Sequence, residues 1–379
     1  MKRALMYASV ASMIDLFNMD NIRILQELGY QVDVACNFEE GSITSVERVK
    51  KFKQELEKQG IRYFQLPIPR SITRITDILK SYKLTKKLTK ENYDLVHCHS
   101  PIGSVICRQA FKNTQTKIVY TAHGFHFYKG APLKNWLIFY PIEKYYSRWT
   151  DVLITINQED YDRARRQKMA KVIEYVPGIG IDLSKYNNGS QSKSTLRAEL
   201  LLPDEALILT SVGELNDNKN HQIVIKALAE INDPKVHYII CGKGDNRDNL
   251  LKLAKELNVS DKIHLLGFRK DIPEILNQSD IFVFPSLREG LPVSLMEAMA
   301  SGLPCIVSDI RGNKDLIEHV KGGFLCKKNI KEEYVEYINY LLTDSKLFCE
   351  MSAYNKAKVK KYDTNTINQK IMKIYLSIS

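Results

Sequence analysis

The chain has no uninterrupted apolar segment that approaches the roughly 20 residues needed for a helix to span a bilayer. Residues 1–14, MKRALMYASVASMI, combine a basic start with a short apolar run, as a signal peptide does. Asp15 follows directly, however, and the apolar stretch also has the length of a first buried strand. We therefore interpret it as a strand and expect a protein that does not cross a membrane.

Cysteine pairs with the spacing of metal or redox sites are also absent from the sequence. The seven cysteines are scattered, without a CxxC motif, at Cys36, Cys98, Cys107, Cys241, Cys305, Cys326 and Cys349. Reduced thiols are the simplest interpretation, which predicts a cytoplasmic protein. His97 and His99 lie at the end of one expected strand, but no third ligand with suitable spacing accompanies them, so we expect no metal there.

The composition is otherwise that of a folded, soluble protein. Of 379 residues, 44% are hydrophobic and 26% are charged, which excludes a low-complexity or disordered chain, and the length favours two domains. The formal net charge of +11 predicts an anionic partner, which is nucleic acid, acidic lipid or a phosphorylated substrate. Charge alone does not choose among these. Because the chain carries no recognisable nucleic-acid-binding motif, we expect no nucleic acid partner.

Short apolar runs rich in Val, Ile and Tyr alternate with longer amphipathic segments, the pattern of parallel strands joined by helices. The expected strands are residues 31–36, 94–98, 117–122, 151–156, 207–212, 236–241, 281–285 and 304–308. The pattern occurs twice, with a break at the proline- and glycine-containing segment VPGIGID, residues 176–182. We therefore predict an α/β protein with two doubly wound domains, residues 1–178 and 179–379, whose ligand sites lie in the cleft at the carboxyl ends of the strands.

The most informative segment is FPSLREGLPVSLMEAMASG, residues 284–302. A strand leads through a short loop to a helix that is expected to begin at Pro292. A helix start after a glycine-containing loop offers free backbone N–H groups and a partial positive charge, which suit a diphosphate. Proline has no N–H, so the expected donors are those of Gly290, Leu291 and Val293.

Glu289 and Glu297 flank this helix start with seven residues between them, one in the loop and one in the helix. Because helical side chains lean towards the N-terminus, Glu297 is expected to reach the same pocket. There we expect Glu297 to accept hydrogen bonds from ribose hydroxyls and Glu289 to accept them from a donor sugar. The alternative is that both glutamates serve only helix capping and solvation, which is the better interpretation of an isolated E-x7-E pattern.

In this pattern the sequence resembles glycosyltransferase family 4, the retaining enzymes with the E-x7-E signature. The resemblance covers essentially the whole chain and is most specific in REGLPVSLMEAMASGLPCIVSD, residues 288–309. It implies the GT-B fold, two Rossmann-like domains facing a central cleft, with the acceptor bound by the first domain and the donor by the second. It also implies no metal or other cofactor, and it allows the last helix, about residues 356–379, to cross back to the first domain.

The segment TSVGELNDNKNH, residues 210–221, resembles the family's loop that opens the donor domain. Gly213 is expected at the donor, and the resemblance gives Lys219 the role of neutralising negative charge on the leaving nucleotide. A solvated surface lysine is the alternative for Lys219. Glu214 stands where the family commonly has arginine, which leaves the second cation open. The candidates for that cation are Arg288, Lys243 and Arg269.

Three more segments carry candidate donor-site residues. Gly242 follows a strand and would let the backbone approach a ligand, although a plain tight turn is at least as good an interpretation. Phe268 and Arg269 lie in the segment that resembles the family's contact with the nucleotide base. His123 follows another strand directly, and the resemblance implies that it contacts the donor sugar; a structural histidine is the alternative. We predict His123, Lys219 and Glu289 as the catalytic residues.

Two segments of the first domain predict contact with a lipid surface or a lipid-linked acceptor. Residues 70–90 combine a strong excess of lysine and arginine with apolar residues at helical spacing. Residues 125–149 are unusually aromatic and basic, which suits a lipid–water interface. We expect peripheral association with the inner leaflet of the cytoplasmic membrane. The alternative is a solvated helix face together with an ordinary aromatic core.

The resemblance predicts a retaining glycosyltransferase that uses a UDP-sugar donor and a polyprenyl-diphosphate-linked saccharide acceptor. The transferred sugar is expected to be an N-acetylhexosamine, a deoxy derivative or a hexose, in the synthesis of capsule or other cell-surface polysaccharide. Two alternatives stay open. A nucleotide-sugar epimerase has the same architecture, but the basic, aromatic first domain argues against it. A non-catalytic, sugar-nucleotide-binding subunit is the other, and Glu214 is the feature that suggests it.

Overall fold

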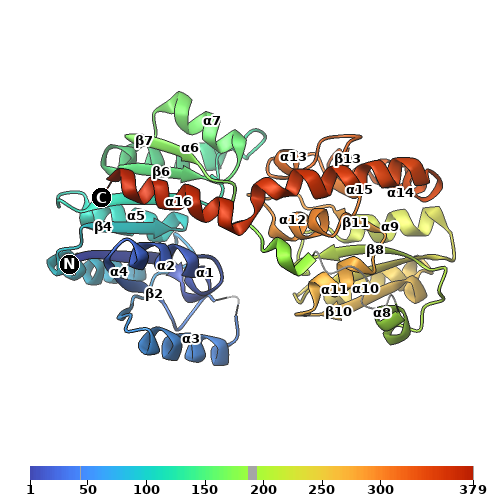
Figure 1. The fold of residues 1–379 in the computed structure, drawn as a ribbon, viewed down its shortest axis with the longest axis horizontal. Coiled ribbons are helices and arrows are strands. Elements are labelled where there is room, and N and C mark those ends of the chain that lie inside the picture. The colour runs from blue at the N-terminus through green and yellow to red at the C-terminus, as the bar shows by residue number, and fades with distance from the viewer. Residues whose placement is uncertain (43, 187–193, 379) are drawn as a thin grey trace. The chain divides into compact units, whose positions relative to one another are not determined.

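A computed structural model of the chain describes residues 1–42, 44–186 and 194–378. The chain divides into two compact units (Figure 1). Unit 1 consists of Met1–Ile179 and Asn365–Ser379, and unit 2 of Gly180–Thr364. Unit 1 is therefore assembled from two separate stretches of sequence, whereas unit 2 is continuous.

Unit 1 contains a seven-stranded parallel sheet of order β3-β2-β1-β4-β5-β6-β7. The strands are β1 Lys2–Val10, β2 Tyr30–Asn37, β3 Tyr63–Gln65, β4 Leu95–His99, β5 Lys117–Ala122, β6 Val152–Thr155 and β7 Val172–Tyr175. The strand order reverses at β1, where the chain moves from β2 and β3 on one side to β4 on the other. Ligand sites of doubly wound sheets form at the carboxyl ends of the strands next to such a reversal.

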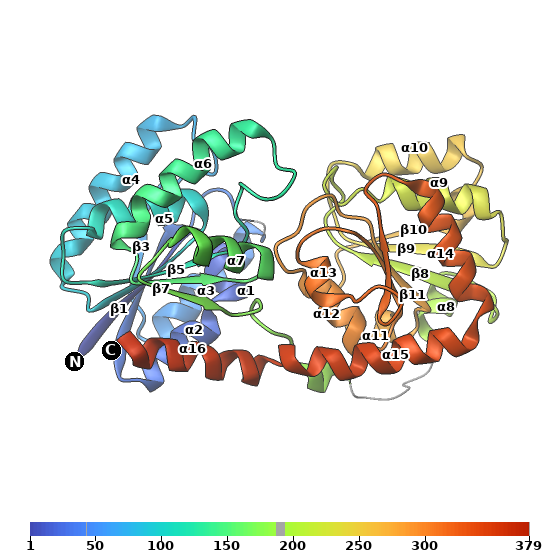
Figure 2. The same cartoon turned by 90° about the horizontal axis from the view of Figure 1, so that it is seen from above.

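Helices cover both faces of this sheet (Figure 2). They are α1 Ala11–Phe17, α2 Met19–Glu27, α3 Val46–Lys58, α4 Ile75–Leu88, α5 Pro101–Phe111, α6 Leu133–Tyr146, α7 Gln158–Gln167 and α16 Thr364–Ile378. Because side chains alternate along a strand, β1 supplies both layers of core. Ala4 and Met6 pack with residues of α1, α2, α3 and α16. Leu5 and Tyr7 pack on the other face with residues of α5 and α7.

Unit 2 contains a six-stranded parallel sheet of order β10-β9-β8-β11-β12-β13. The strands are β8 Leu207–Val212, β9 Val236–Cys241, β10 Ile263–Gly267, β11 Ile281–Phe284, β12 Cys305–Ser308 and β13 Gly323–Cys326. The helices are α8 Ser194–Glu199, α9 Gln222–Ile231, α10 Arg247–Glu256, α11 Ile272–Asn277, α12 Val293–Ala300, α13 Asn313–Leu316, α14 Lys331–Thr343 and α15 Ser345–Val359. Residues of α9, α10 and α14 form the core on one face, and Leu196 and Ile275 pack on the other.

The predicted parallel α/β architecture is confirmed, and the expected strands at 117–122, 207–212 and 236–241 coincide with β5, β8 and β9. Strands β3, β7, β10 and β13 were not predicted, and they are the four edge strands of the two sheets. An edge strand is covered less completely than a central one, so its sequence need not be apolar on both faces. In β3 and β7 no residue is fully buried.

The predicted start of the last helix, at about residue 356, is wrong. Helix α15 continues to Val359, a 3₁₀ turn covers Lys360–Tyr362, and α16 begins only at Thr364. The break has a backbone cause: Ile181 N donates to the Tyr362 carbonyl at 2.9 Å and Thr364 N donates to the Ile181 carbonyl at 3.0 Å. These bonds use peptide groups that a continuous helix would need for itself.

Candidate active site

Two predicted donor-site residues of unit 2 form an ion pair. Lys219, in the loop after β8, places its Nζ 2.7 Å from Glu289 Oε1, in the loop between β11 and α12. Both side chains are largely buried, with 18% and 14% of their surface exposed. The Lys219 ammonium also lies 4.5 Å from the centroid of the Phe284 ring, a cation–π contact. Positive charge is therefore held next to the start of α12.

Backbone contacts fix these two loops against each other. Leu287 N donates to the Asn218 carbonyl at 2.7 Å, and Asn218 Nδ2 donates to the Arg288 carbonyl at 3.0 Å. Because Asn218 precedes Lys219 directly and Arg288 precedes Glu289 directly, the ion pair sits on backbone that is already tied together. The position of the Lys219 ammonium thus depends on loop geometry and not on the ion pair alone.

Glycine is required where the loops approach most closely. A Cβ on Gly242 would lie 1.8 Å from the carbonyl oxygen of Gly213, and a Cβ on Gly312 would lie 2.3 Å from that of Gly290. Gly213 faces Lys219 itself, since a Cβ there would lie 3.0 Å from Lys219 Cε. Gly242 therefore has a packing reason to be glycine that is independent of any ligand, whereas the neighbour of Gly213 is only the flexible side chain of Lys219.

Helix α12 begins at Val293 with Pro292 as its N-cap residue, one position later than expected. No side chain caps this end of the helix. The first N–H groups of a helix have no partner within it, so the end of α12 next to Gly290 presents donors and a partial positive charge. Leu291 is buried and Val293 is partly buried.

Glu297, the second glutamate of the E-x7-E pattern, has a hydrogen-bond partner that the sequence did not indicate. Tyr186, in the 3₁₀ turn Leu183–Tyr186, donates its hydroxyl to Glu297 Oε1 at 2.9 Å. Burial raises the pKa of Glu297, and the bond from Tyr186 opposes that rise. Burial together with the neighbouring carboxylate raises the pKa of the Tyr186 phenol, which therefore stays protonated as a donor. The two side chains hold one another in place.

Arg269, one of the candidates for the second cation, forms ion pairs with two carboxylates in this structure. Its guanidinium donates to both carboxylate oxygens of Asp271, at 2.8 and 2.5 Å, and to both of Glu199, at 2.5 and 3.1 Å. Phe268, beside it, is 67% exposed. Glu214 is exposed and accepts a hydrogen bond from Asn216 Nδ2 at 2.9 Å, so it does not pair with Lys219.

Arg311 is a buried cation at this site that sequence reasoning missed. It lies between β12 and α13, is 9% exposed, and its Nε donates to the Glu289 carbonyl at 3.3 Å. The cation lies far from Glu289 in the sequence and meets it only through the close approach of Gly312 to Gly290. The sequence signal that was available is a lone arginine after a buried strand, which is too weak to single out.

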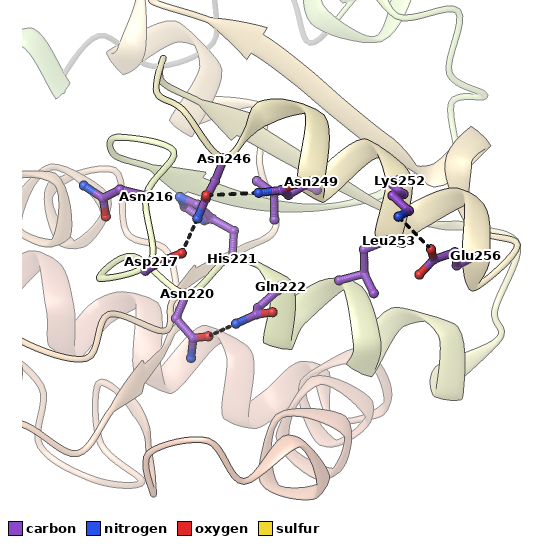
Figure 3. Close-up of a pocket in the computed structure, with 11 residues that line it drawn as sticks. Asn216, Asp217, Asn220, His221, Gln222, Asn246, Asn249, Lys252, Leu253 and Glu256 are labelled. Carbon is purple, nitrogen blue, oxygen red and sulfur yellow. Dashed lines mark hydrogen bonds and ion pairs between the residues drawn. The ribbon is translucent and has the colours of Figure 1, made fainter.

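A pocket of about 350 Å³ borders the loop that carries Lys219 (Figure 3). Five amide side chains of the loop and of α9 and α10 contribute to its lining: Asn216, Asn220, Gln222, Asn246 and Asn249. His221 also lines it, and its Nδ1 contacts the Tyr238 hydroxyl at 3.1 Å. Lys219 and Glu289 do not line this pocket, so it is separate from the ion pair, although the same loop forms both.

Unit 1 carries the predicted His123 at the end of β5, where it contacts a second histidine. His99 Nδ1, at the end of β4, lies 3.1 Å from His123 Nε2. His97, two residues earlier on β4, contacts the Tyr375 hydroxyl of α16 at 2.6 Å through Nδ1 and Thr121 Oγ1 at 2.8 Å through Nε2. Burial lowers the pKa of His97 to about 3 and that of His123 to about 4, so both rings are neutral at pH 7.

The described residues include no group of three His, Cys, Asp or Glu side chains arranged to hold a metal ion. None of the described helices is long and apolar enough to cross a membrane. Helices α4 and α6 nevertheless expose large apolar side chains, among them Ile75, Leu79, Leu133 and Leu137, which are between 54% and 72% exposed. Both helices pack on α5 of unit 1.

Two Rossmann-like units, one with an uncapped helix start beside a buried lysine, are the architecture expected of a nucleotide-sugar-dependent glycosyltransferase. Comparison with known proteins agrees. The family described as Glycosyltransferase Family 4 matches residues 19–185, and the family described as Glycosyl transferases group 1 matches residues 192–358.

The chain is 34% identical over 333 residues to the putative glycosyltransferase EpsD of Bacillus subtilis, covering 86% of this chain and 84% of that protein. It is 31% identical over 310 residues to an Escherichia coli protein named UDP-Gal:alpha-D-GlcNAc-diphosphoundecaprenol alpha-1,3-galactosyltransferase, covering 79% of each. The crystal structure of Anabaena HepE in complex with UDP and glucose aligns over 100% of both chains, with a TM-score of 0.79 at 21% identity, which shows the same GT-B fold. The chain therefore belongs to glycosyltransferase family 4 and is a glycosyltransferase.

Proposed function

We propose that this glycosyltransferase moves a hexose or an N-acetylhexosamine, with retention of configuration, from a UDP-sugar to a polyprenyl-diphosphate-linked saccharide in cell-surface polysaccharide synthesis. The name of the Escherichia coli relative supports both substrate classes, because it specifies a UDP-sugar donor and a diphosphoundecaprenol-linked acceptor. The name of a second relative, from Campylobacter jejuni, specifies N-acetylgalactosamine transfer to a diphospho-undecaprenol acceptor. No metal or other cofactor is needed for this reaction as we propose it.

The observation that carries the proposal is the Lys219–Glu289 pair beside the uncapped start of α12. In this proposal the diphosphate of the donor binds the N–H groups near Gly290 and the Lys219 ammonium. Both stabilise the negative charge that grows on the leaving UDP, and they need no reorganisation during the reaction. Arg311 adds a second positive charge next to the same backbone, in the role that Glu214 cannot fill.

The remaining predicted residues take roles around the sugar and the nucleoside. Glu297 accepts hydrogen bonds from ribose hydroxyls while Tyr186 holds its carboxylate in place. Glu289 and His123 contact the donor sugar. The acceptor hydroxyl attacks from the face that UDP leaves, and a phosphate oxygen of UDP accepts its proton, so no enzyme carboxylate becomes glycosylated.

Thermal unfolding with a panel of nucleotides and nucleotide sugars tests the donor part of the proposal. A ligand at 100 times its Kd that binds only the folded state stabilises it by about 2.7 kcal/mol, so UDP or one UDP-sugar is expected to raise Tm. Glu297→Gln should reduce this shift. The matched control is Glu350→Gln, because Glu350 is a 63% exposed residue on α15. No shift with any nucleotide would contradict the proposed donor site.

Transfer itself distinguishes the main proposal from its alternatives. Purified protein with the UDP-sugar identified above should form a new glycosidic bond on a diphosphoundecaprenol-linked sugar. An epimerase would instead convert the UDP-sugar without an acceptor, and a non-catalytic subunit would bind the donor without turnover. Either of those two results would overturn the assignment of a transferase reaction to this chain.

We also propose that α4 and α6 bind the membrane surface. Exposed Leu133 and Leu137 on α6 and Ile75 and Leu79 on α4 supply apolar contacts, and the lysines of both helices supply attraction to anionic headgroups. Flotation with anionic vesicles should recover the protein, whereas neutral vesicles should recover much less.

The double variant Leu133→Ser/Leu137→Ser should bind anionic vesicles at least about tenfold more weakly, since each removes a large apolar contact. Leu376→Ser is the matched control, because Leu376 is a 56% exposed leucine on α16, outside α4 and α6. Equal loss of binding in both variants would contradict a specific role for α6.

A further inference from the structure

The carboxyl ends of β4 and β5 carry polar side chains on one face of the unit 1 sheet. His97 and His99 are two residues apart on β4, and Thr121 and His123 are two residues apart on and just after β5. In the parallel register His99 stands opposite Thr121. Side chains two residues apart on a strand share a face, so the four side chains gather at one place. The contacts among His97, Thr121, His99 and His123 confirm this.

His97 and His99 differ in how their ring nitrogens are satisfied. Both nitrogens of His97 contact hydroxyl groups, those of Tyr375 and Thr121. A hydroxyl donates or accepts as required, so either tautomer of His97 is satisfied. His99 is 1% exposed, its Nδ1 contacts His123 Nε2, and its Nε2 has no hydrogen-bond partner among the described residues. The surroundings of His99 therefore favour one of its tautomers over the other.

Only two arrangements of protons are compatible with the contact between the two neutral rings. In the first, His99 Nδ1–H donates to His123 Nε2, which leaves a bare lone pair on His99 Nε2 and the proton of His123 on Nδ1. In the second, His123 Nε2–H donates to His99 Nδ1, which leaves a buried N–H on His99 Nε2 without an acceptor. Orphaned buried N–H groups are rarer in proteins than acceptors with an unused lone pair. The first arrangement is therefore the more stable one.

We propose that His99 is a positioning residue that fixes His123 as the Nδ1–H tautomer, so that His123 presents a hydrogen-bond donor to an oxygen atom of the donor sugar. The inference rests on the proposed function in placing the sugar at His123. This tautomer also limits the role of His123 in the reaction. With Nε2 occupied by the bond from His99 and Nδ1 already carrying a proton, His123 cannot act as the base that takes the proton of the acceptor hydroxyl.

The tautomer is measurable directly by NMR of protein labelled with nitrogen-15 in its eight histidines. The protonated and bare nitrogens of a neutral imidazole have well-separated shifts, and the His123→Asn spectrum assigns the ring. The expected result is a proton on Nδ1 of His123 in the wild-type protein. A proton on Nε2 would overturn the inference, and this outcome does not depend on any variant of His99 folding.

Two substitutions test whether His99 sets the tautomer. His99→Asn keeps an amide N–H near the position of the ring Nδ1 and should retain the His123 tautomer, whereas His99→Phe keeps the ring but removes the donor and should release it. Transfer by His99→Phe is expected to fall about fivefold in kcat, the effect of one hydrogen bond, with rescue by His99→Asn. An unchanged His123 tautomer in His99→Phe would overturn the positioning role.

The spectra and the kinetics separate this inference from the proposed function. If the tautomer of His123 changes in His99→Phe while kcat and KM stay as in the wild-type protein, His99 sets the tautomer but His123 does not contact the donor sugar. That result would remove His123 from the proposed site and would leave the donor site of unit 2 untouched. A protein without transferase activity in any variant, with the expected spectra, would contradict the proposed function alone.

Discussion

The carboxyl ends of the two sheets carry opposite kinds of polar chemistry. In unit 2 the loops after β8 and β11 hold an ionised pair, Lys219 and Glu289, that is largely but not completely buried. In unit 1 the ends of β4 and β5 hold His97, His99 and His123, which burial keeps neutral. The same Rossmann-like topology thus presents charge at one sheet and neutral hydrogen-bonding groups at the other.

Burial and pairing explain this difference. An isolated charge in the interior is strongly unfavourable, so a buried histidine loses its proton, whereas the Lys219 ammonium lies beside a carboxylate and an aromatic ring. The difference also matches the proposed chemistry, because the leaving diphosphate develops charge and the sugar hydroxyls do not. Four predictions test the comparison: the largest effect on activity comes first and the loss of a single hydrogen bond comes last.

Replacing the cation of unit 2 should have the largest effect. Lys219→Met removes the charge beside the leaving diphosphate and leaves Glu289 as an unpaired carboxylate, so kcat should fall about 10²–10³-fold, the range for loss of one preorganised electrostatic contact. Lys226→Met is the control, since Lys226 is exposed on α9. Steady-state kinetics with the identified UDP-sugar measure both. Equal activity of the two variants would show that the Lys219–Glu289 ion pair supports the structure but does not stabilise the leaving diphosphate.

Gly242→Ala should destabilise unit 2, because its Cβ would overlap the Gly213 carbonyl oxygen at 1.8 Å and the backbone must shift. Overpacking of this kind costs about 1–3 kcal/mol. Gly213→Ala serves for comparison, because its Cβ would meet only the flexible end of the Lys219 side chain, at 3.0 Å. This variant should therefore lose more activity than stability. Thermal unfolding and kinetics of both variants separate the two effects, and similar Tm losses would contradict the distinction.

Acid should destabilise unit 1 through its neutral histidines. The pKa of His97 in the folded protein is about 3 and that of His123 about 4, below the ordinary value of 6.5, so the unfolded chain binds protons first as the pH falls. This contribution to stability is complete above about pH 6.5 and is lost as the pH falls towards 4. Each group should lower the free energy of unfolding by about 1.4 kcal/mol per pH unit within that window.

Both tryptophans, Trp136 and Trp149, lie in unit 1, so tryptophan fluorescence during urea unfolding follows this unit alone. In His97→Gln the loss of stability between pH 6.5 and 4 should be smaller than in the wild-type protein. The same pH dependence in both proteins would show that another group, and not His97, is responsible.

Tyr186→Phe should have the smallest effect of the four. It removes one hydrogen bond to Glu297, worth about 1 kcal/mol, and should raise KM for the UDP-sugar about fivefold with little change in kcat, because Glu297 is proposed to bind the ribose. Tyr340→Phe is the control, since Tyr340 is 52% exposed on α14. A fall in kcat at unchanged KM would instead place Glu297 near the reacting centre.

The sequence predicted the central strands well and the start of α12 to within one residue, because apolar runs and proline carry strong local signals. It did not predict the edge strands β3, β7, β10 and β13. Partial exposure weakens the apolar pattern of β3, β7 and β10, whereas β13 is largely buried but only four residues long. The roles of the predicted site residues stay predictions, but the contact of Lys219 with Glu289 is in the structure.

Several partners of the predicted site residues could not be found from the sequence. Tyr186 meets Glu297, and Arg311 meets the Glu289 backbone, only through tertiary approach of segments that carry no motif of their own. The sequence pattern presents His99 only as a possible metal ligand, because its contact with His123 depends on the strand register, which the sequence does not specify. The ion pairs that neutralise Arg269 likewise depend on the fold, since Glu199 lies on α8.

Because unit 1 is built from two separate stretches of sequence, its core is completed late in synthesis. Ile367, Ile371, Ile374 and Tyr375 of α16 belong to the same core as Ala4 and Met6 of β1. During translation the strands of unit 1 leave the ribosome first, yet α1, α2 and α3 cover one face of their sheet only in part until the residues of α16 emerge. Unit 2, which is continuous, can close its core earlier. The half of the enzyme that is synthesised first is therefore the half that is completed last, and a ribosome that stops before residue 365 releases a chain with an open apolar surface.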